Sequence, residues 1–168
     1  MKGATQAFIT NRSGRIYGIN TAEVGDTSKN PIDYMMTVTG GADLRGIATD
    51  GVSLFVVDAT NGAPVLRVVN PATLTLVSPD APSFSEVDIS TIQTAAVSVG
   101  TNPNEVVVFK GKAYVSNQDD GSVTVIDTTS NTVTATIAVG SQPFGMNAFT
   151  VGVTDYLYVT NLKSNSIS

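Results

Sequence analysis

A four-residue signature that recurs four times constrains the fold of this chain more than any other feature. Each copy has an aromatic residue, two small or β-branched residues, and then Asn or Asp. The copies read FITN at 8–11, FVVD at 55–58, YVSN at 114–117 and YVTN at 158–161, so their aromatic residues are 47, 59 and 44 residues apart. Self-similarity at such a period indicates a row of similar units, each of which buries a face against its neighbour.

The third unit shows the strands of one repeat most clearly. Residues 113–117 form a predicted strand, and the Asp120-Gly121 pair that follows tolerates the positive φ of a tight hairpin. Residues 122–127 and 132–139 alternate in side-chain character, as two further strands would, with a turn between them. Short alternating strands at this period predict β-propeller blades, which are four-stranded antiparallel sheets. We therefore expect an all-β fold.

Composition supports this prediction and excludes several classes of function. Charged residues make up 14% of the chain, hydrophobic residues make up 42%, and the net charge is −5. The Lys and Arg residues are scattered, so there is no basic stripe for DNA or RNA. The absence of Cys and His removes disulfides, thiolate nucleophiles, iron–sulfur sites, the Ser–His triad and the commonest zinc ligand. We predict no metal site and no cofactor.

The last third of the chain resembles a known family. Residues 113–145 read AYVSNQDDGSVTVIDTTSNTVTATIAVGSQPFG, and residues 157–168 read LYVTNLKSNSIS. These stretches are similar to the YVTN family of β-propeller repeats, in which a Tyr-Val-Thr-Asn strand is followed by a Val-Ile-Asp strand and by a Thr-Val strand ending in Val-Gly-x-x-Pro. The resemblance is specific over residues 112–168 and holds only by position before them. It implies a propeller of about seven blades, in an exported or cell-surface protein of bacteria or archaea.

The signature divides the chain into an incomplete row of blades. We expect a partial first blade at 1–40, a second at 41–100, a third at 101–140 and the start of a fourth at 141–168. Extra residues at about 78–93 are interpreted as a surface excursion from the outer edge of the second blade, with a partner-binding loop as the alternative. A closed ring needs at least about four blades. We predict either a piece of a longer propeller or a subunit completed by another copy, with a filament formed by strand addition as a third arrangement.

Loops at one end of the blades form the candidate binding site. The connections from the last strand of one blade to the first strand of the next occupy corresponding positions, so their side chains should gather on one face. No residue is predicted to be catalytic, and an ordinary structural role for these loop residues stays open. The candidate residues are Asp43, Arg45, Asn102, Asn104, Glu105, Gln142 and Phe144.

Three other polar groups have structural explanations. Residues 117–121 (NQDDG) suggest a calcium loop, but the ligand spacing fails and a hairpin turn explains them. Glu86 and Asp88 are a candidate pair for acid–base chemistry, although they alternate with Val87 and Ile89 as a solvated strand face would. The Asn or Asp that ends each signature is expected to cap a turn by accepting backbone N–H bonds.

These observations favour a non-enzymatic structural or interaction module. Its blades would hold variable loops for a protein or glycan partner, and the chain would associate with further copies or further blades. We expect it to act outside the cell or on the cell surface, as the resemblance implies. No signal peptide is recognisable in the sequence, and no apolar run reaches the ~18 residues that span a membrane. The alternative is one part of a propeller enzyme, a lactonase-like hydrolase or an oxidoreductase, whose active-site ligands lie elsewhere.

Overall fold

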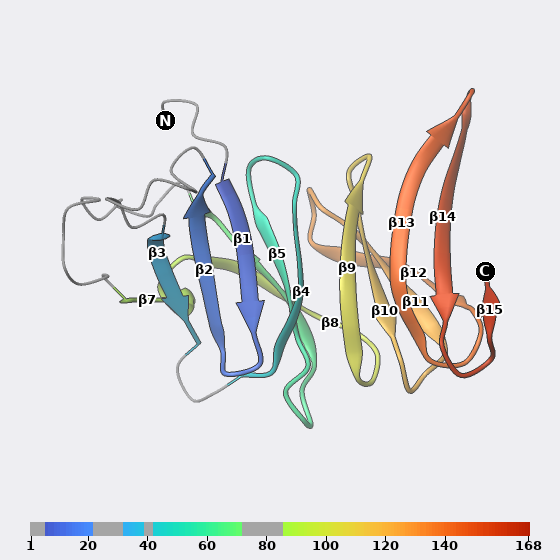
Figure 1. The fold of residues 1–168 in the computed structure, drawn as a ribbon, viewed down its shortest axis with the longest axis horizontal. Coiled ribbons are helices and arrows are strands. Elements are labelled where there is room, and N and C mark those ends of the chain that lie inside the picture. The colour runs from blue at the N-terminus through green and yellow to red at the C-terminus, as the bar shows by residue number, and fades with distance from the viewer. Residues whose placement is uncertain (1–5, 22–31, 39–41, 72–85) are drawn as a thin grey trace.

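The computed structural model describes residues 6–21, 32–38, 42–71 and 86–168. Within these residues the chain forms four β-sheets, arranged in a row that runs from the blue end to the red end of Figure 1. The described part also contains a 3-10 turn at Ile89–Thr91, but it has no helix long and apolar enough to cross a membrane. The prediction of an all-β fold built from four-stranded blades is confirmed.

The third sheet shows why this sequence forms a blade. β9 (Pro103–Phe109), β10 (Lys112–Asn117), β11 (Ser122–Asp127) and β12 (Thr132–Ala138) pair antiparallel in chain order. Gly121 has a φ of 58°, which the tight turn between β10 and β11 requires. β11 is buried along most of its length because sheets cover both of its faces, whereas β12 is the exposed outer strand.

The second sheet has the same layout with one interruption. β4 (Leu44–Thr49), β5 (Leu54–Asp58) and β6 (Val65–Val69) pair antiparallel, and β8 (Gln93–Ser98) is the outer strand. β5 is buried throughout, because a sheet packs on each of its faces. The interruption lies between β6 and β8, where the sequence predicts extra length.

The inserted segment adds a strand to the preceding sheet. β1 (Gln6–Asn11), β2 (Arg15–Asn20) and β3 (Ile32–Thr37) form an antiparallel meander, and β7 (Glu86–Asp88) pairs with β3 in parallel. Directly after β7, Ile89 is fully buried in the cluster between the first two sheets. Residues 86–88 of the insertion therefore lie along the outer edge of the neighbouring blade, and the part of the insertion before residue 86 lies outside the described residues.

The fourth sheet contains β13 (Pro143–Val151), β14 (Thr154–Asn161) and β15 (Ser166–Ile167), which pair antiparallel. One face of β13 and β14 packs on the third sheet. The other face has no neighbouring sheet among the described residues. The first and fourth sheets therefore end the row, on opposite sides of Figure 1.

Apolar side chains fill the space between each pair of consecutive sheets. The cluster between the second and third sheets contains Phe55, Leu66, Val115 and Ile126, all of them fully buried. Smaller clusters lie between the first and second sheets and between the third and fourth. Each sheet is therefore stabilised mainly by packing on its neighbours, which are two for the second and third sheets and one for the first and fourth.

Candidate functional site

The inner strands β4, β9 and β13 begin at corresponding positions at one end of the sheets. A predicted site residue precedes each of them, and its carbonyl accepts a hydrogen bond from the turn after the signature Asn or Asp. These bonds run from Ala59 N to Asp43 O (2.9 Å), from Gln118 N to Asn102 O (3.1 Å) and from Leu162 N to Gln142 O (2.8 Å). The three residues therefore share a structural role, which is to tie the connection between two blades to the adjacent turn.

Arg45 is held by residues of two blades. Its Nε and Nη2 donate to Asp43 Oδ2 at 3.1 and 2.7 Å, and its Nη1 donates to Asn102 Oδ1 at 2.6 Å. The same Nη1 also donates to the carbonyl of Pro103 at 3.1 Å. Because the side chain is largely buried, these bonds replace the water that the guanidinium gives up. Arg45 therefore clamps the second sheet to the third.

Asn104 and Phe144 hold the positions in the next two inner strands that correspond to Arg45. Asn104 Nδ2 donates to the carbonyl of Phe144 at 3.4 Å, so this side chain also reaches the following sheet. The Phe144 ring is half exposed near the start of β13. The three equivalent side chains thus form a line across three inner strands, from a buried cation to an exposed aromatic ring.

Glu105 lies one residue further along β9, and its carboxylate reaches the fourth sheet. Glu105 Oε2 accepts a hydrogen bond from Met146 N at 2.6 Å. Burial raises the pKa of the Glu105 carboxyl above its ordinary value of 4.5, and the bond from Met146 opposes that shift. On the other side, Gly46 allows β4 to approach β9 closely, since a Cβ there would lie 2.7 Å from Glu105 Cα. Glu105 is therefore a partly desolvated acid between three blades.

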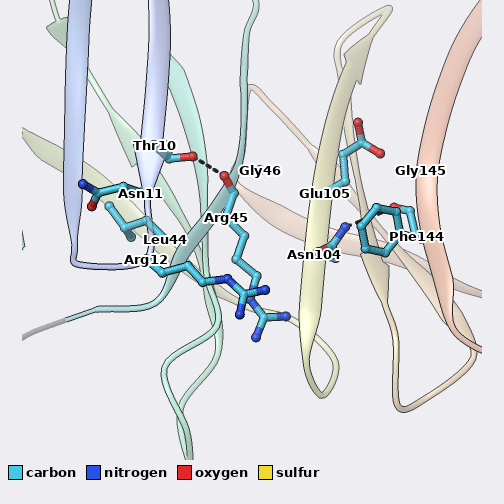
Figure 2. A pocket seen from close by; sticks show the side chains of 10 residues that line it. All are labelled: Thr10, Asn11, Arg12, Leu44, Arg45, Gly46, Asn104, Glu105, Phe144 and Gly145. Atoms are coloured by element: carbon cyan, nitrogen blue, oxygen red, sulfur yellow. Dashed lines mark hydrogen bonds between the residues drawn. The ribbon is translucent and has the colours of Figure 1, made fainter.

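Arg45, Asn104, Glu105 and Phe144 line a concave surface, which encloses a volume of about 450 Å³ (Figure 2). Four of the seven residues predicted from the sequence line it, and Asp43 and Asn102 adjoin it as the partners of Arg45. Gln142 lies apart from it, in another hollow beside Asp119. The lining residues are Thr10, Asn11, Arg12, Leu44, Arg45, Gly46, Asn104, Glu105, Phe144 and Gly145.

The sequence prediction omitted the residues that the first sheet contributes, of which Arg12 is the most exposed. Arg12 lies in the turn between β1 and β2, its side chain is 75% exposed, and its Nε lies 3.8 Å from Asp43 Oδ1. This Asp43 oxygen is buried and accepts no hydrogen bond from the described residues. The strand order of an antiparallel blade does indicate that Arg12 lies near the predicted loops. The second strand of an antiparallel blade ends where the first begins, so the turn after each signature lies beside the predicted loops.

Of the signature Asn residues, Asn11 caps its own turn as the sequence predicts, whereas Asn117 binds the connection before β9 and Asn161 Oδ1 accepts no hydrogen bond from the described residues. Asn117 Oδ1 accepts a hydrogen bond from Gly100 N at 3.0 Å. Asn11 Oδ1 accepts bonds from the backbone N–H groups of Ser13 and Arg15, at 3.0 and 3.1 Å. These side chains satisfy backbone groups of the fold, so they are not free to bind a ligand.

The other acidic groups considered for chemistry also contact the backbone. Asp88 Oδ1 accepts a hydrogen bond from Ser90 N at 2.9 Å and caps the 3-10 turn, whereas the side chain of Glu86 lies outside the described residues. Asp120 Oδ2 accepts a bond from Thr101 N at 2.7 Å. In the part of the chain that the structure describes, no three His, Cys, Asp or Glu side chains are grouped closely enough to hold a metal ion.

Comparison with known proteins identifies the fold. A scan of protein-family models and a search of curated proteins found no match. Among solved structures, AztD from Citrobacter koseri is 17% identical with a TM-score of 0.56, covering 86% of this chain and 34% of AztD. A protein of unknown function from Bacteroides caccae is 10% identical (TM-score 0.48), covering 99% of this chain and 60% of that one. Glutaminyl cyclase from Myxococcus xanthus is 14% identical (TM-score 0.36), with coverages of 94% and 81%.

The similarity to AztD shows a β-propeller-like fold. At this level of identity it shows the fold alone, because unrelated functions share such scaffolds. The chain spans about a third of the length of AztD and 60% of the length of the Bacteroides protein. The resemblance to the YVTN family stays a prediction from the sequence.

Proposed function

We propose that this chain is a non-enzymatic interaction module of the YVTN type, whose blades hold a concave binding surface for a protein or glycan partner. The proposal rests on the state of the polar groups at that surface. Arg45 donates four hydrogen bonds to other parts of the chain, and the Glu105 carboxylate accepts one from Met146 N. Side chains that are engaged in this way hold a surface in shape, but they are poorly placed to act on a substrate.

Arg12 and Phe144 are the groups that this surface offers to a partner. Both side chains are exposed, and the bonds of Arg45 and Asn104 hold the inner strands that lie between them. A guanidinium donates to carboxylate or carbonyl oxygens, and an exposed ring packs on the apolar face of a sugar or of a peptide side chain. A fitting partner presents a polar group to Arg12 and an apolar surface to Phe144.

Binding to glycan and peptide arrays tests the proposal. We expect the wild-type chain to bind a subset of the array members, and Phe144→Ala and Arg12→Ala each to weaken that binding about tenfold or more, as for an interface anchor. Val153→Ala is the matched control, because Val153 is fully exposed in the turn at the opposite end of the same sheet. Binding that survives both site substitutions, or no binding to either array, would contradict the proposal.

The proposal also includes a location outside the cell or on its surface, and association with further blades or further copies. The resemblance to YVTN repeats supports the location. The uncovered face of the fourth sheet supports the association, because blades of this kind are normally packed on both sides.

One part of a propeller enzyme is the alternative, and Glu105 is the residue that favours it. A carboxyl with a raised pKa beside a concave surface can serve as a general acid. Glu105→Gln separates the two functions, since Gln keeps an acceptor for Met146 N but cannot exchange a proton. For an interaction module, this variant should bind the array within about twofold of the wild type. Lactone or ester hydrolysis that the same variant abolishes would favour the enzyme.

A further inference from the structure

The three contacts between consecutive sheets use one recurring arrangement. Phe8 packs on the cluster between the first and second sheets, Phe55 lies in the cluster between the second and third, and Tyr114 packs on the cluster between the third and fourth. The signature aromatic residue therefore faces the next sheet. The residue after it faces the preceding sheet, as Val115 and Val159 do. We call these two sides of a sheet its forward face and its backward face.

A hydroxyl group at the third position of the signature adds a hydrogen bond across two of these contacts. Ser116 Oγ donates to the carbonyl of Phe144 in the next sheet at 3.1 Å. Thr10 Oγ1 donates to the carbonyl of Arg45, at the corresponding position of the second sheet. A forward face therefore offers both a ring and a hydroxyl group to the inner strand of the following blade.

The fourth sheet has the same forward face, but no sheet covers it within the described residues. Tyr158 and Tyr156 are 46% and 43% exposed. Phe149 lies beside them, with ring centroids 5.3 Å from Tyr158 and 6.1 Å from Tyr156. At the third signature position, Thr160 donates to Gly145 O of its own sheet. Contiguous exposed rings of this kind mark an interaction surface.

The first sheet presents a backward face made by β1 and β2, and it has no strand equivalent to β4, β9 or β13 among the described residues. Ile9 holds the position of Val115 and Val159, which are buried against the preceding sheet, yet Ile9 is 51% exposed. Tyr17 lies directly across from Ile9 in β2, so the two side chains share this face. Figure 1 places the two uncovered faces at opposite ends of the row of sheets.

We infer that the forward face of the fourth sheet binds the backward face of the first sheet in a second copy of this chain, and that two such contacts close a ring of two copies. A backward face is the expected partner for the forward face of the fourth sheet, because every other forward face in the described structure is covered by a backward face. Two copies of four sheets give eight sheets, which lies within the range of about four to eight blades in closed propellers. The pairing supplies the association that the proposed function includes, and it does not depend on a ligand at the concave surface.

An acidic substitution on each face tests this pairing. Light scattering on the 168-residue chain should give twice the 17.4 kDa mass of one chain. Tyr158→Asp and Ile9→Asp should each halve that mass, because either places an unpaired charge in an apolar contact. Both side chains are about half exposed in the single chain, so circular dichroism should show an unchanged fold. Val153→Asp, in an exposed turn of the fourth sheet, is the control and should keep the doubled mass.

Mixing the two variants tests whether the forward face of one copy binds the backward face of the other. In a ring of two copies, one Tyr158→Asp chain and one Ile9→Asp chain still share one contact in which both faces are natural. The mixture should therefore regain the doubled mass, which neither variant gives alone. A monomeric wild-type chain, a polydisperse wild-type assembly, or a dimer that Ile9→Asp leaves unchanged would overturn the inference. These outcomes are distinct from failure of the proposed function, because the array experiment tests that function with substitutions at Arg12 and Phe144.

Discussion

The third and fourth sheets carry the same signature, but only the third is covered on both faces. Tyr114 packs on a cluster that contains Met146 and Val159 of the next sheet, whereas the corresponding Tyr158 is half exposed. Both residues lie in the second strand of their sheet and pair antiparallel with the inner strand. The signature therefore determines the strand and its turn, and the sheet that follows determines what the aromatic ring contributes to stability.

The largest expected effect is at an aromatic residue that the next sheet covers. Phe55 is fully buried, so Phe55→Ala should lower the free energy of unfolding by about 3–5 kcal/mol. Tyr158→Ala removes a half-exposed ring. In a dilute solution of the chain, this variant should lower the free energy of unfolding by less than about 1.5 kcal/mol. Urea titration followed by circular dichroism measures both losses. Equal losses would contradict the expectation that a covered ring contributes more to stability than an uncovered one.

A second comparison concerns the last residue of the signature in the second and third sheets. Arg67 Nε and Nη2 donate to the buried Asp58 Oδ2 at 2.8 and 2.6 Å, whereas Asn117 Nδ2 donates to Thr124 Oγ1 at 2.9 Å. Arg67 and Thr124 hold corresponding positions in the third strand of their sheets. Arg67→Thr should lower the free energy of unfolding by about 3 kcal/mol, because the Asp58 carboxylate then stays buried without its cation.

A second substitution extends this comparison. Adding Asp58→Asn to Arg67→Thr reproduces the pair of the third sheet, so the double variant should recover at least about half of the loss measured for Arg67→Thr. The free energies again come from urea titration. If the second substitution restores nothing, the two sheets do not use this position in the same way.

A smaller effect is expected from the hydroxyl group that joins two sheets. Ser116 is fully buried, accepts a hydrogen bond from Glu105 N at 3.2 Å, and donates to Phe144 O at 3.1 Å. Ser116→Ala should therefore cost about 1–2 kcal/mol in the free energy of unfolding. Thr160→Val is the matched change in the fourth sheet, where the hydroxyl is exposed and bonds within its own sheet, and it should cost less than about 1 kcal/mol. A greater loss for Thr160→Val would reverse the expected order.

The smallest expected effect depends on pH. Burial raises the pKa of the Glu105 carboxyl, so the folded chain binds this proton more tightly than the unfolded chain. The resulting stabilisation is complete below about pH 4 and is lost as the pH rises through the folded-state pKa. The difference in unfolding free energy between wild type and Glu105→Gln should therefore decrease from about pH 4 to about pH 7. A difference that stays constant over this range would show that the carboxyl is not desolvated.

The candidate site could be predicted in part, since its loops occupy equivalent places in successive repeats. Arg45, Asn104, Glu105 and Phe144 do line one concave surface, with Asp43 and Asn102 holding Arg45 beside it. Gln142 is equivalent to Asn102, and both have positive φ, but Gln142 lies at another hollow. Arg12 could not be selected from the loops alone, because it comes from a turn of another type in the preceding blade.

Features that act over a few residues follow from the amino-acid sequence alone. Alternating side chains, the glycine at the turn after Asn117 and a capping residue such as Asn11 specify strands and tight turns. Three features instead depend on how the chain packs in space: β7 pairs in parallel with β3, Arg12 faces Asp43, and Tyr158 is exposed while Tyr114 is covered. These outcomes depend on contacts between residues far apart in the chain, and the pattern of a strand does not identify the strand or sheet that will pack on it.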